Sequence, residues 1–461
     1  MKSQKQSTVA AVATPHGEGG IAVIRISGTD ALSISSAVYR GAETLEHAEE
    51  RRAVYGRIVH KGRFIDEVII TVFRAPRSYT GEDTVEISCH GSPYIASLVL
   101  QSLVENGAVP AGPGEFTKRA FLNGKIDLAQ AEAVADLIKA RTESARRVAG
   151  MQVSGYLSKY IDEMRTAIIQ ASALLELELD FSEQDIEFVS RDEIKQNLLD
   201  IKSKLKRLVE SYNRGRVCRE GIRMAITGLP NVGKSSVLNG LMERERAIVT
   251  HIPGTTRDTI EDVLDIEGIK VRITDTAGIR RSDDPVEQQG VMRAKKAVHE
   301  ADVVLLVLDG SRPVSSDTVN LISWVRESAK DIVCILNKAD LEQQTTQEEM
   351  ATLLPDKEVW SVSAIEDQGM RTLIKVITSH ALKRGLPDGQ ELLITRERHR
   401  DAVAKALERV DHAVLSIDRD MSQEFIALDM RGAADALGAI MGTVSPDDVL
   451  NKIFADFCIG K

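Results

Sequence analysis

The sequence predicts a multidomain protein in which an α/β domain is inserted into an all-α helical domain and is preceded by an α+β domain. The chain has 461 residues, enough for about three domains. Short strand-like runs fill the first 118 residues, whereas no proline occurs between Pro113 and Pro230, where helical periodicity dominates. Strands and helices then alternate up to about residue 381, after which the chain becomes helical again.

Composition and charge exclude several classes of protein. The formal net charge of −10 argues against a protein that coats nucleic acid, although it allows a local basic patch. The longest apolar run, Val303 to Leu308, is far too short for a membrane helix. The four cysteines show no CxxC spacing, which disfavours a zinc knuckle or a disulfide framework and predicts a reducing, cytoplasmic location without membrane attachment.

The N-terminal α+β domain is expected over residues 1–118. Turn-forming Gly, Pro and Asp residues separate its β-prone runs, and one helix is expected at 94–104. The predicted strands are 8–13, 21–26, 53–59, 68–73 and 84–88.

The helical domain is expected in two parts, residues 119–215 and 382–461. In the segment 192–212, apolar residues recur at spacings of three and four, as they do from Leu128 to Ile138. Each part is explained by ordinary core packing, but helices with one apolar stripe cannot bury it alone. We therefore expect the two parts to pack together as one domain.

The inserted domain, residues 216–381, has the pattern of a parallel sheet covered by helices on both faces. Its expected strands are nearly continuous runs of Val, Ile and Leu, as is typical of strands buried on both sides. They are 222–227, 270–274, 303–308, 332–336 and 358–362.

A phosphate-binding loop opens this domain. The segment Gly228-Leu-Pro-Asn-Val-Gly233-Lys234-Ser235 fits G-x-x-x-x-G-K-[ST], directly after an apolar strand and before a helix. Its backbone N–H groups can surround phosphates, Lys234 supplies a cation for the β- and γ-phosphates, and Ser235 offers its hydroxyl to Mg²⁺.

Further motifs follow in the order expected of a GTP-binding domain. Asp275-Thr-Ala-Gly278 ends a strand, where the aspartate can hold Mg²⁺ through water. Asn337-Lys338-Ala-Asp340 ends a later strand, and its last carboxylate can accept two hydrogen bonds from guanine that adenine cannot donate. The predicted GTP-binding residues are Asn231, Val232, Gly233, Lys234, Ser235, Ser236, Thr250, His251, Ile252, Pro253, Gly254, Thr255, Thr256, Asp275, Thr276, Ala277, Gly278, Asn337, Lys338, Asp340, Ser363 and Ala364.

The residue after Gly278 does not suit the usual hydrolytic mechanism. Ras-like switches have a glutamine there that orients the attacking water, whereas this chain has Ile279. Either hydrolysis is slow, or the water is positioned from elsewhere. The polar stretch from Arg280 to Gln289 is predicted to be a loop, which is either only solvated or supplies a carboxylate such as Glu287.

Together with motifs outside the inserted domain, this pattern resembles the MnmE (TrmE) family of tRNA uridine-modification GTPases over essentially the whole chain. The motifs are Arg25-Ile-Ser-Gly28, Ser78-Tyr-Thr-Gly-Glu-Asp83, Phe121-Leu-Asn-Gly-Lys-Ile-Asp-Leu-Ala-Gln130 and Cys458-Ile-Gly-Lys461. The resemblance implies a folate-binding, dimer-forming N-terminal domain and a P-loop GTPase domain inserted into the helical domain.

The resemblance also implies potassium-dependent GTP hydrolysis, with the two GTPase domains of a homodimer meeting face to face. A cation beside the phosphates can replace an arginine finger, which contributes roughly 10³–10⁵ in rate in other GTPases. Glu287 matches the catalytic glutamate of the family. The implied metal ligands are Asn231, Thr250, Ile252 and Thr255 for K⁺, and Ser235 and Thr256 for Mg²⁺.

The implied reaction modifies C5 of the wobble uridine in tRNA. Methylenetetrahydrofolate supplies one carbon, glycine or ammonium completes a carboxymethylaminomethyl or aminomethyl group, and a MnmG/GidA-type flavoprotein carrying FAD forms a hetero-oligomer with the chain. The implied folate-binding residues are Arg25, Glu82, Lys125 and Lys461, and Cys458 is a candidate for a chemical role. A carboxylate suits the amino-pyrimidine edge of a pterin, and cations suit the glutamate tail.

Two positions depart from the family pattern. Glu18 stands in a glycine turn where a basic residue is expected. The ligand contact that a basic side chain would make from that loop is therefore not carried over to this chain. Pro253 lacks an N–H but leaves the carbonyl of Ile252 free, so we expect K⁺ binding to survive.

Two other functions are compatible with parts of the pattern. A dynamin-like mechanical GTPase would need a membrane-active segment, and none stands out. A ribosome-assembly GTPase would leave the folate-like motifs without a role. The basic cluster Arg141, Arg146 and Arg147 is explained either as a solvated helix face, which we favour, or as a tRNA contact.

Overall fold

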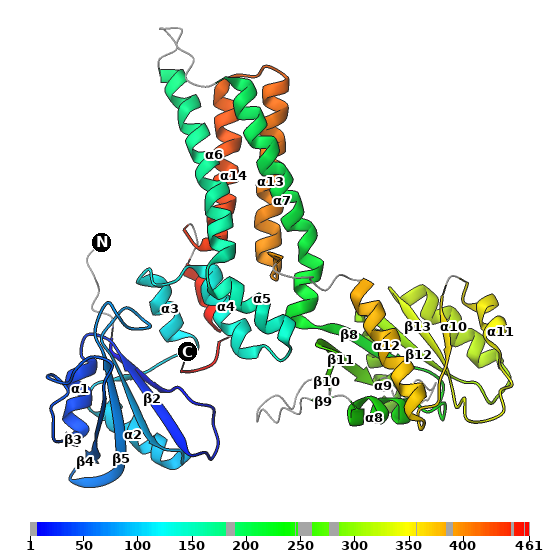
Figure 1. The fold of residues 1–461 in the computed structure, drawn as a ribbon, viewed down its shortest axis with the longest axis horizontal. Coiled ribbons are helices and arrows are strands. Elements are labelled where there is room, and N and C mark those ends of the chain that lie inside the picture. Colours follow the sequence, from blue (N-terminus) through cyan, green and yellow to red (C-terminus); the bar gives the residue numbers. More distant parts are fainter. Residues whose placement is uncertain are drawn as a thin grey trace. The chain divides into compact units, whose positions relative to one another are not determined.

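The computed structural model describes residues 7–180, 190–244, 246–247, 261–275, 285–355, 357–383, 391–443, 447–455 and 457–460. The chain divides into two compact units, coloured along the sequence in Figure 1. The first comprises Met1–Ala135, Gln152–Ser172 and Arg431–Lys461, and the second comprises Asp136–Met151 and Ala173–Met430.

The N-terminal part of the first unit is a seven-stranded sheet in the order β3-β4-β5-β6-β2-β1-β7, with helices α1 and α2 packed on it. The pairs are antiparallel except β1 with β7, which is parallel. The elements are β1 (Val9–Val12), β2 (Ile21–Ser27), α1 (Ala31–Val38), β3 (Tyr39–Gly41), β4 (Ala53–His60), β5 (Arg63–Phe73), β6 (Thr84–His90), α2 (Pro93–Glu105) and β7 (Val109–Pro110).

Alternation along these strands places one side of the sheet in the main core, while a smaller cluster with Phe116 covers part of the other side. On β2, Ile24 and Ile26 are fully buried while Arg25 between them faces the opposite side. The buried side meets Val99 and Leu103 of α2 in one hydrophobic cluster. The five predicted strands and the predicted helix are confirmed, whereas helix α1 and the short strands β3 and β7 were not anticipated.

The first unit also contains α3 (Glu115–Leu122), the start of α4 (Leu128–Lys139) and α15 (Asp447–Ala455). Leu128 of α4 and Phe454 of α15 belong to one buried cluster, so the C-terminal end of the chain packs beside α4. The terminal segment reaches further, because Ile459 forms a β-bridge with Pro113 just before α3. The segment that carries Ile459 therefore contacts the chain just after the N-terminal sheet.

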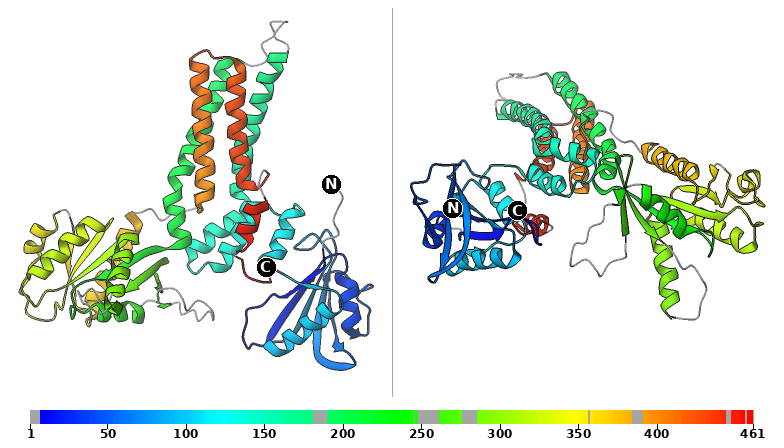
Figure 2. Two further views of the ribbon diagram at one scale, coloured as in Figure 1. Left: turned by 180° about the vertical axis from the view of Figure 1, so that it is seen from behind. Right: turned by 60° about the horizontal axis from the view of Figure 1, so that its bottom comes forward.

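The helical part contains α5 (Glu143–Val153), α6 (Tyr156–Asp180), α7 (Arg191–Glu220), α13 (Glu397–Asp418) and α14 (Gln423–Met441). Helices α7 and α13 run side by side (Figure 2). The predicted apolar stripe of α7 is buried at Ile194, Leu198 and Leu205. Segments on both sides of the insertion therefore pack together, as the sequence predicted.

The α/β part of the second unit has a seven-stranded sheet in the order β14-β13-β12-β8-β11-β10-β9. The first five of these strands are parallel, and β10 and β9 are antiparallel to their neighbours. The strands are β8 (Ile222–Thr227), β9 (Arg246–Ala247), β10 (Glu261–Ile266), β11 (Ile269–Asp275), β12 (Val303–Asp309), β13 (Ile332–Asn337) and β14 (Val359–Ser361).

Helices cover both faces of this sheet, and a separate hydrophobic cluster fills each side. The helices are α8 (Lys234–Arg244), α9 (Pro285–Glu300), α10 (Ser316–Ser328), α11 (Gln347–Leu353) and α12 (Asp367–Lys383). The predicted strands and the doubly covered sheet are confirmed. One expectation was wrong: residues 285–289 begin α9 instead of continuing a polar loop, because Pro285 is suited to the first position of a helix.

Within the described part of the chain, none of the helices combines the length and the apolar character needed to cross a membrane.

Candidate functional site

The phosphate-binding loop joins the central strand β8 to helix α8, so it lies at the carboxyl edge of the parallel sheet. Its backbone needs two left-handed residues, Asn231 at φ +65° and Gly233 at φ +97°. A Cβ atom at Gly233 would lie 2.2 Å from Nδ2 of Asn337, so only glycine fits this position. The glycine therefore allows the loop to approach the strand-end motif after β13.

Lys234 closes this loop on itself. Its Nζ donates hydrogen bonds to the carbonyl oxygens of Gly228, at 3.0 Å, and Leu229, at 2.8 Å. Ser235 and Ser236 are exposed in the first turn of α8, where unpaired backbone N–H groups and the helix dipole favour an anion. The arrangement suits a polyphosphate with a metal ion at the Ser235 hydroxyl.

Asn337 braces the phosphate-binding loop against the last recognition loop. Its Nδ2 donates to the carbonyl oxygen of Val232 at 2.8 Å, and its Oδ1 accepts from the backbone N–H of Ala364 at 3.1 Å. The side chain is buried at 2% exposure, so both ends of the amide are used internally. Asn337 thus fixes the phosphate site and the predicted base site relative to each other.

The predicted guanine-binding carboxylate is accessible and oriented. Asp340 is exposed, and its Oδ1 accepts a hydrogen bond from the Ser363 hydroxyl at 2.6 Å. Ser363 itself is buried. The carboxylate is therefore held from the protein side while it remains open to a ligand.

Asp309, at the end of β12, was missed by the sequence analysis. Its Oδ2 lies 2.7 Å from Nζ of Lys338, which has a left-handed backbone at φ +65°. Burial alone would raise the pKa of Asp309, but hydrogen bonds from Lys338 and Ser311 outweigh burial and lower this pKa. The only signal in the sequence was an aspartate at the end of an apolar strand.

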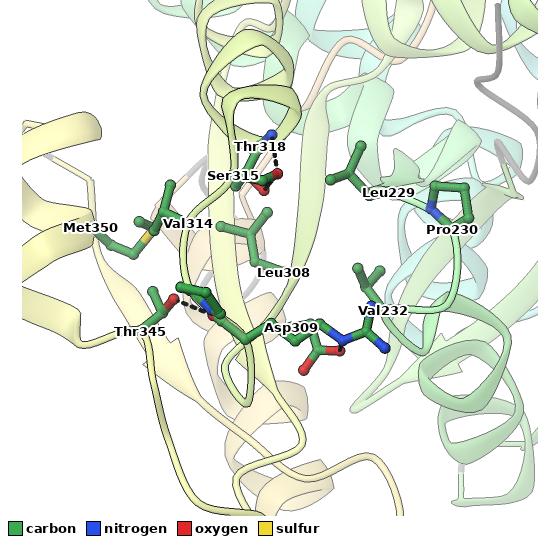
Figure 3. A pocket seen from close by; sticks show the side chains of 12 residues that line it. Leu229, Pro230, Val232, Leu308, Asp309, Val314, Ser315, Thr318, Thr345 and Met350 are labelled. Atoms are coloured by element: carbon green, nitrogen blue, oxygen red, sulfur yellow. Dashed lines mark hydrogen bonds and ion pairs between the residues drawn. The ribbon is translucent and has the colours of Figure 1, made fainter.

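A cavity of about 170 Å³ adjoins the phosphate-binding loop. Figure 3 shows Leu229 and Pro230 of the loop on one side, and Ser315 and Thr318 at the start of α10 toward the other. The backbone N–H of Thr318 donates to the Ser315 hydroxyl, which caps α10. The cavity is thus framed by the same strand ends as the nucleotide site.

Several predicted residues lie outside the described part of the chain: Thr250, His251, Ile252, Pro253, Gly254, Thr255, Thr256, Thr276, Ala277, Gly278 and Lys461. Asp275 is the last residue of β11 and pairs in register with Ile226 of β8, which places its backbone at the same sheet edge as the phosphate-binding loop. Glu287 lies in the first turn of α9, and only its backbone is described.

A second group of charged and aromatic side chains lies in the first unit. We call it the Glu82 cluster, and it consists of Arg25, Ser27, Tyr79, Glu82, Glu86, Phe116, Arg119 and Lys125. The loop between β5 and β6, which carries Ser78-Tyr-Thr-Gly-Glu-Asp83, is at its centre.

Arg25 lies on the side of the sheet opposite the main core. Its Nε and one terminal nitrogen lie 2.9 and 2.7 Å from Oε1 of Glu86, which is its neighbour across the strands. Its guanidinium also lies over the rings of Tyr79 and Phe116, each with its centroid at 5.5 Å. The Arg25 guanidinium is therefore held by the Glu86 carboxylate and by contacts with two aromatic rings.

Glu82 receives hydrogen bonds from two directions. The Ser27 hydroxyl donates to Oε2 at 2.8 Å, and Arg119 of α3 donates from one terminal nitrogen to both carboxylate oxygens at 3.1 and 3.3 Å. Arg119 was not among the predicted residues, because one arginine in an amphipathic helix carries no distinguishing sequence signal.

Lys125 lies on the other side of the same loop. Its Nζ donates to the carbonyl oxygen of Pro76 at 3.0 Å, and a Cβ added at Gly81 would lie 3.3 Å from the lysine stem. Asn123 ties the two segments together by donating to the carbonyl oxygen of Thr80 at 2.8 Å. Of the four predicted folate residues, Glu82 thus lies on this loop, and Arg25 and Lys125 contact it.

Cys458 is exposed in the terminal segment, and its carbonyl oxygen accepts from the backbone N–H of Gly114 at 3.3 Å. Among the described residues, no group of three or more His, Cys, Asp or Glu side chains is arranged to hold a metal ion.

The parallel sheet, the phosphate-binding loop and the two loops after β13 and β14 define a P-loop GTPase domain. Comparison with known proteins gives the family. Residues 8–125 match the family described as GTP-binding protein TrmE N-terminus, and residues 128–458 match the MnmE helical domain.

Two relatives, both named tRNA modification GTPase MnmE, match almost end to end. The protein from Clostridioides difficile is 40% identical over 456 residues, covering 98% of this chain and 99% of its own. The protein from Acetivibrio thermocellus is 40% identical over 459 residues, covering 99% and 100%. The chain belongs to the MnmE family of tRNA modification GTPases and is a GTP hydrolase.

Among solved structures, the G domain of the FeoB iron transporter of T. maritima matches at 24% identity with a TM-score of 0.28. The match covers 35% of this chain and 98% of that one.

Proposed function

We propose that this protein is a potassium-dependent GTPase that modifies C5 of the wobble uridine in tRNA together with a FAD-containing partner of the MnmG/GidA type. The names of its relatives support a role in tRNA modification. The observation that carries the finer proposal is the presence in one chain of a guanine nucleotide site and of the Glu82 cluster, which suits a folate.

The nucleotide site favours GTP over ATP. Asp340 can accept hydrogen bonds from N1–H and the 2-amino group of guanine, while Ser363 orients the carboxylate. The ammonium group of Lys234 is the counter-charge for the phosphates, and the hydroxyls of Ser235 and Thr256 are the proposed protein ligands of Mg²⁺.

Hydrolysis is proposed to use a K⁺ ion because Ile279 cannot orient water. The exposed, left-handed Asn231 stands at the tip of the phosphate-binding loop, where its side chain is available as an oxygen ligand. Thr250, Ile252 and Thr255 complete the proposed site, and Glu287 at the start of α9 acts on the attacking water.

Replacing K⁺ with Na⁺ is expected to slow GTP turnover by roughly a hundredfold or more, since the smaller ion fits the oxygen ligands poorly and cannot stabilise the transition-state charge in the same place.

Glu287→Ala is expected to reduce turnover while GTP affinity stays within about threefold. Phosphate release in both salts and nucleotide titration measure these effects. Equal rates in both salts would remove the K⁺ site, and a collapse of affinity would make Glu287 structural.

The Glu82 cluster is proposed to bind a tetrahydrofolate derivative, which supplies a one-carbon unit when bound. Glu82 would accept hydrogen bonds from the amino-pyrimidine edge, and the cations Arg25, Lys125 and Lys461 would hold carboxylates of the glutamate tail. The partly buried ion pairs and the two aromatic rings beside the Arg25 guanidinium support a ligand that is both planar and charged.

The proposed organisation is a homodimer whose chains each contain residues 1–118 as a folate-binding domain, 119–215 and 382–461 as a helical domain, and 216–381 as the GTPase domain. The flavoprotein and tRNA complete the assembly. We place the protein in the cytoplasm, which agrees with four unpaired cysteines.

The decisive experiment is a nucleoside analysis of tRNA from cells that lack the gene. Loss of carboxymethylaminomethyl- and aminomethyl-type uridines, with recovery when the intact chain is supplied, is the expected result. Recovery should fail for a Glu82→Gln chain that still hydrolyses GTP. An unchanged nucleoside profile in the deleted strain would reject the proposed reaction while leaving the GTPase intact.

A further inference from the structure

Arg119 is the most enclosed charged side chain of the Glu82 cluster. It projects from α3, its side chain is 4% exposed, and the Glu82 side chain is 17% exposed. Its Nε lies 3.1 Å from Oε1 of Glu115, and its second terminal nitrogen donates to the carbonyl oxygen of Ser7 at 2.8 Å. One arginine therefore joins the start of β1, helix α3 and the loop before β6.

Two carboxylates, those of Glu82 and Glu115, share the one buried cation of Arg119. A buried charge is costly unless all its donors are satisfied, and here each of the three nitrogens has an acceptor. The nitrogen that faces Glu82 contacts both carboxylate oxygens, whereas Glu115 is contacted through one. The contact thus restricts the rotation of the Glu82 carboxylate.

Ser27, at the end of β2, also restrains the Glu82 carboxylate. Its hydroxyl donates to Oε2 of Glu82 at 2.8 Å and also lies 2.8 Å from the hydroxyl of Thr80. Each carboxylate oxygen has more than one lone pair, so the contacts to Arg119 and Ser27 leave acceptor capacity on Glu82. That capacity lies on a side chain that is still partly accessible.

We propose that Arg119 is a positioning residue that orients Glu82 as a two-point acceptor for adjacent N–H donors of a ligand. The inference rests on the proposed folate site and deepens it. An aminopyrimidine ring presents such a pair of parallel donors, and it requires a carboxylate, because a protonated acid would direct its own O–H at one of them.

Three variants test the assignment with folinic acid, an air-stable tetrahydrofolate derivative, in calorimetric titrations of the full chain. Arg119→Met removes the charge and is expected to weaken binding roughly ten- to a hundredfold, the range for loss of a charged hydrogen bond. Arg119→Lys restores the charge without the fork and is expected to recover part of this loss. Glu115→Gln is the matched control, since it breaks an ion pair of the same arginine without touching Glu82, and it should bind within about threefold of the natural chain.

Double variants that combine an Arg119 substitution with Glu82→Gln show whether Arg119 positions Glu82 or only stabilises the fold. If Arg119 acts through Glu82, then Arg119→Met or Arg119→Lys should change affinity by less than about threefold in the Glu82→Gln background. Equal losses in both backgrounds would overturn the inference, as would natural affinity in Arg119→Met. Should Arg119→Met fail to fold, the Arg119→Lys cycle decides alone, and GTP turnover confirms the integrity of each variant.

The two proposals fail in different ways. Absence of folinic acid binding by the natural chain would overturn the folate site and this inference together. Binding by the natural chain that is lost in Glu82→Gln but kept in all Arg119 variants would overturn this inference alone.

Discussion

The GTP site and the Glu82 cluster are built on opposite principles. In the GTP site, the functional groups follow parallel strands at one sheet edge, and the backbone register of β8, β11, β12 and β13 brings them together. In the Glu82 cluster, a strand, a loop, a helix and a following turn meet through side-chain contacts. The first site is fixed by hydrogen bonds of the sheet, and the second by ion pairs and a few polar contacts.

This difference determines how each site responds to substitution. A sheet edge keeps its geometry when one exposed side chain changes, so the GTP site is most sensitive where chemistry or backbone conformation is altered. In the Glu82 cluster, the sheet fixes Arg25, Ser27 and Glu86, but Glu82 lies on a loop and depends on donors from residues 27 and 119. We therefore expect even distant polar contacts to affect its ligand affinity.

The largest expected effect comes from Lys234→Ala. The substitution removes the cation at the phosphates and leaves the carbonyl oxygens of Gly228 and Leu229 without their donor, so kcat/KM for GTP should fall roughly a hundredfold or more. Phosphate release measures this loss. Folinic acid binding should remain unchanged, and Lys206→Ala, on the exposed side of α7, is the control. A parallel loss of folinic acid binding would contradict the independence of the two sites.

The contrast also explains what the sequence could predict. The phosphate-binding loop and the Asn337–Asp340 motif were recognisable because a contiguous motif at a strand end determines its own position. Asp309 and Arg119 were not predicted, since their importance lies in partners 29 and 37 residues away in the chain. Periodicity located the strands and long helices, but it gave no indication of these ion pairs.

Gly233→Ala tests whether the GTP site depends on backbone conformation. The new Cβ would lie 2.2 Å from Nδ2 of Asn337 and would displace the bond to Val232, so GTP affinity should fall roughly tenfold or more. Gly268→Ala is the matched control in the same domain, because its φ of +81° carries similar strain but nothing lies within 4 Å. It should lower the melting temperature while GTP affinity changes by less than about threefold. Equal loss of affinity in both variants would assign the effect to general destabilisation.

The smallest effect is expected for Asn123→Ala in the Glu82 cluster. The substitution removes the bond from Nδ2 to the carbonyl oxygen of Thr80, so folinic acid affinity should fall about two- to tenfold, the range for one neutral hydrogen bond. Asn106→Ala removes a bond of the same kind, from Nδ2 to the carbonyl oxygen of Ser102 at 2.7 Å, but within the end of α2. Titration should show natural affinity for this control. Because the two asparagines make chemically equivalent bonds, a difference between them would measure the contribution of the long-range contact, and equal affinities would mean that the loop carrying Glu82 holds its shape without Asn123.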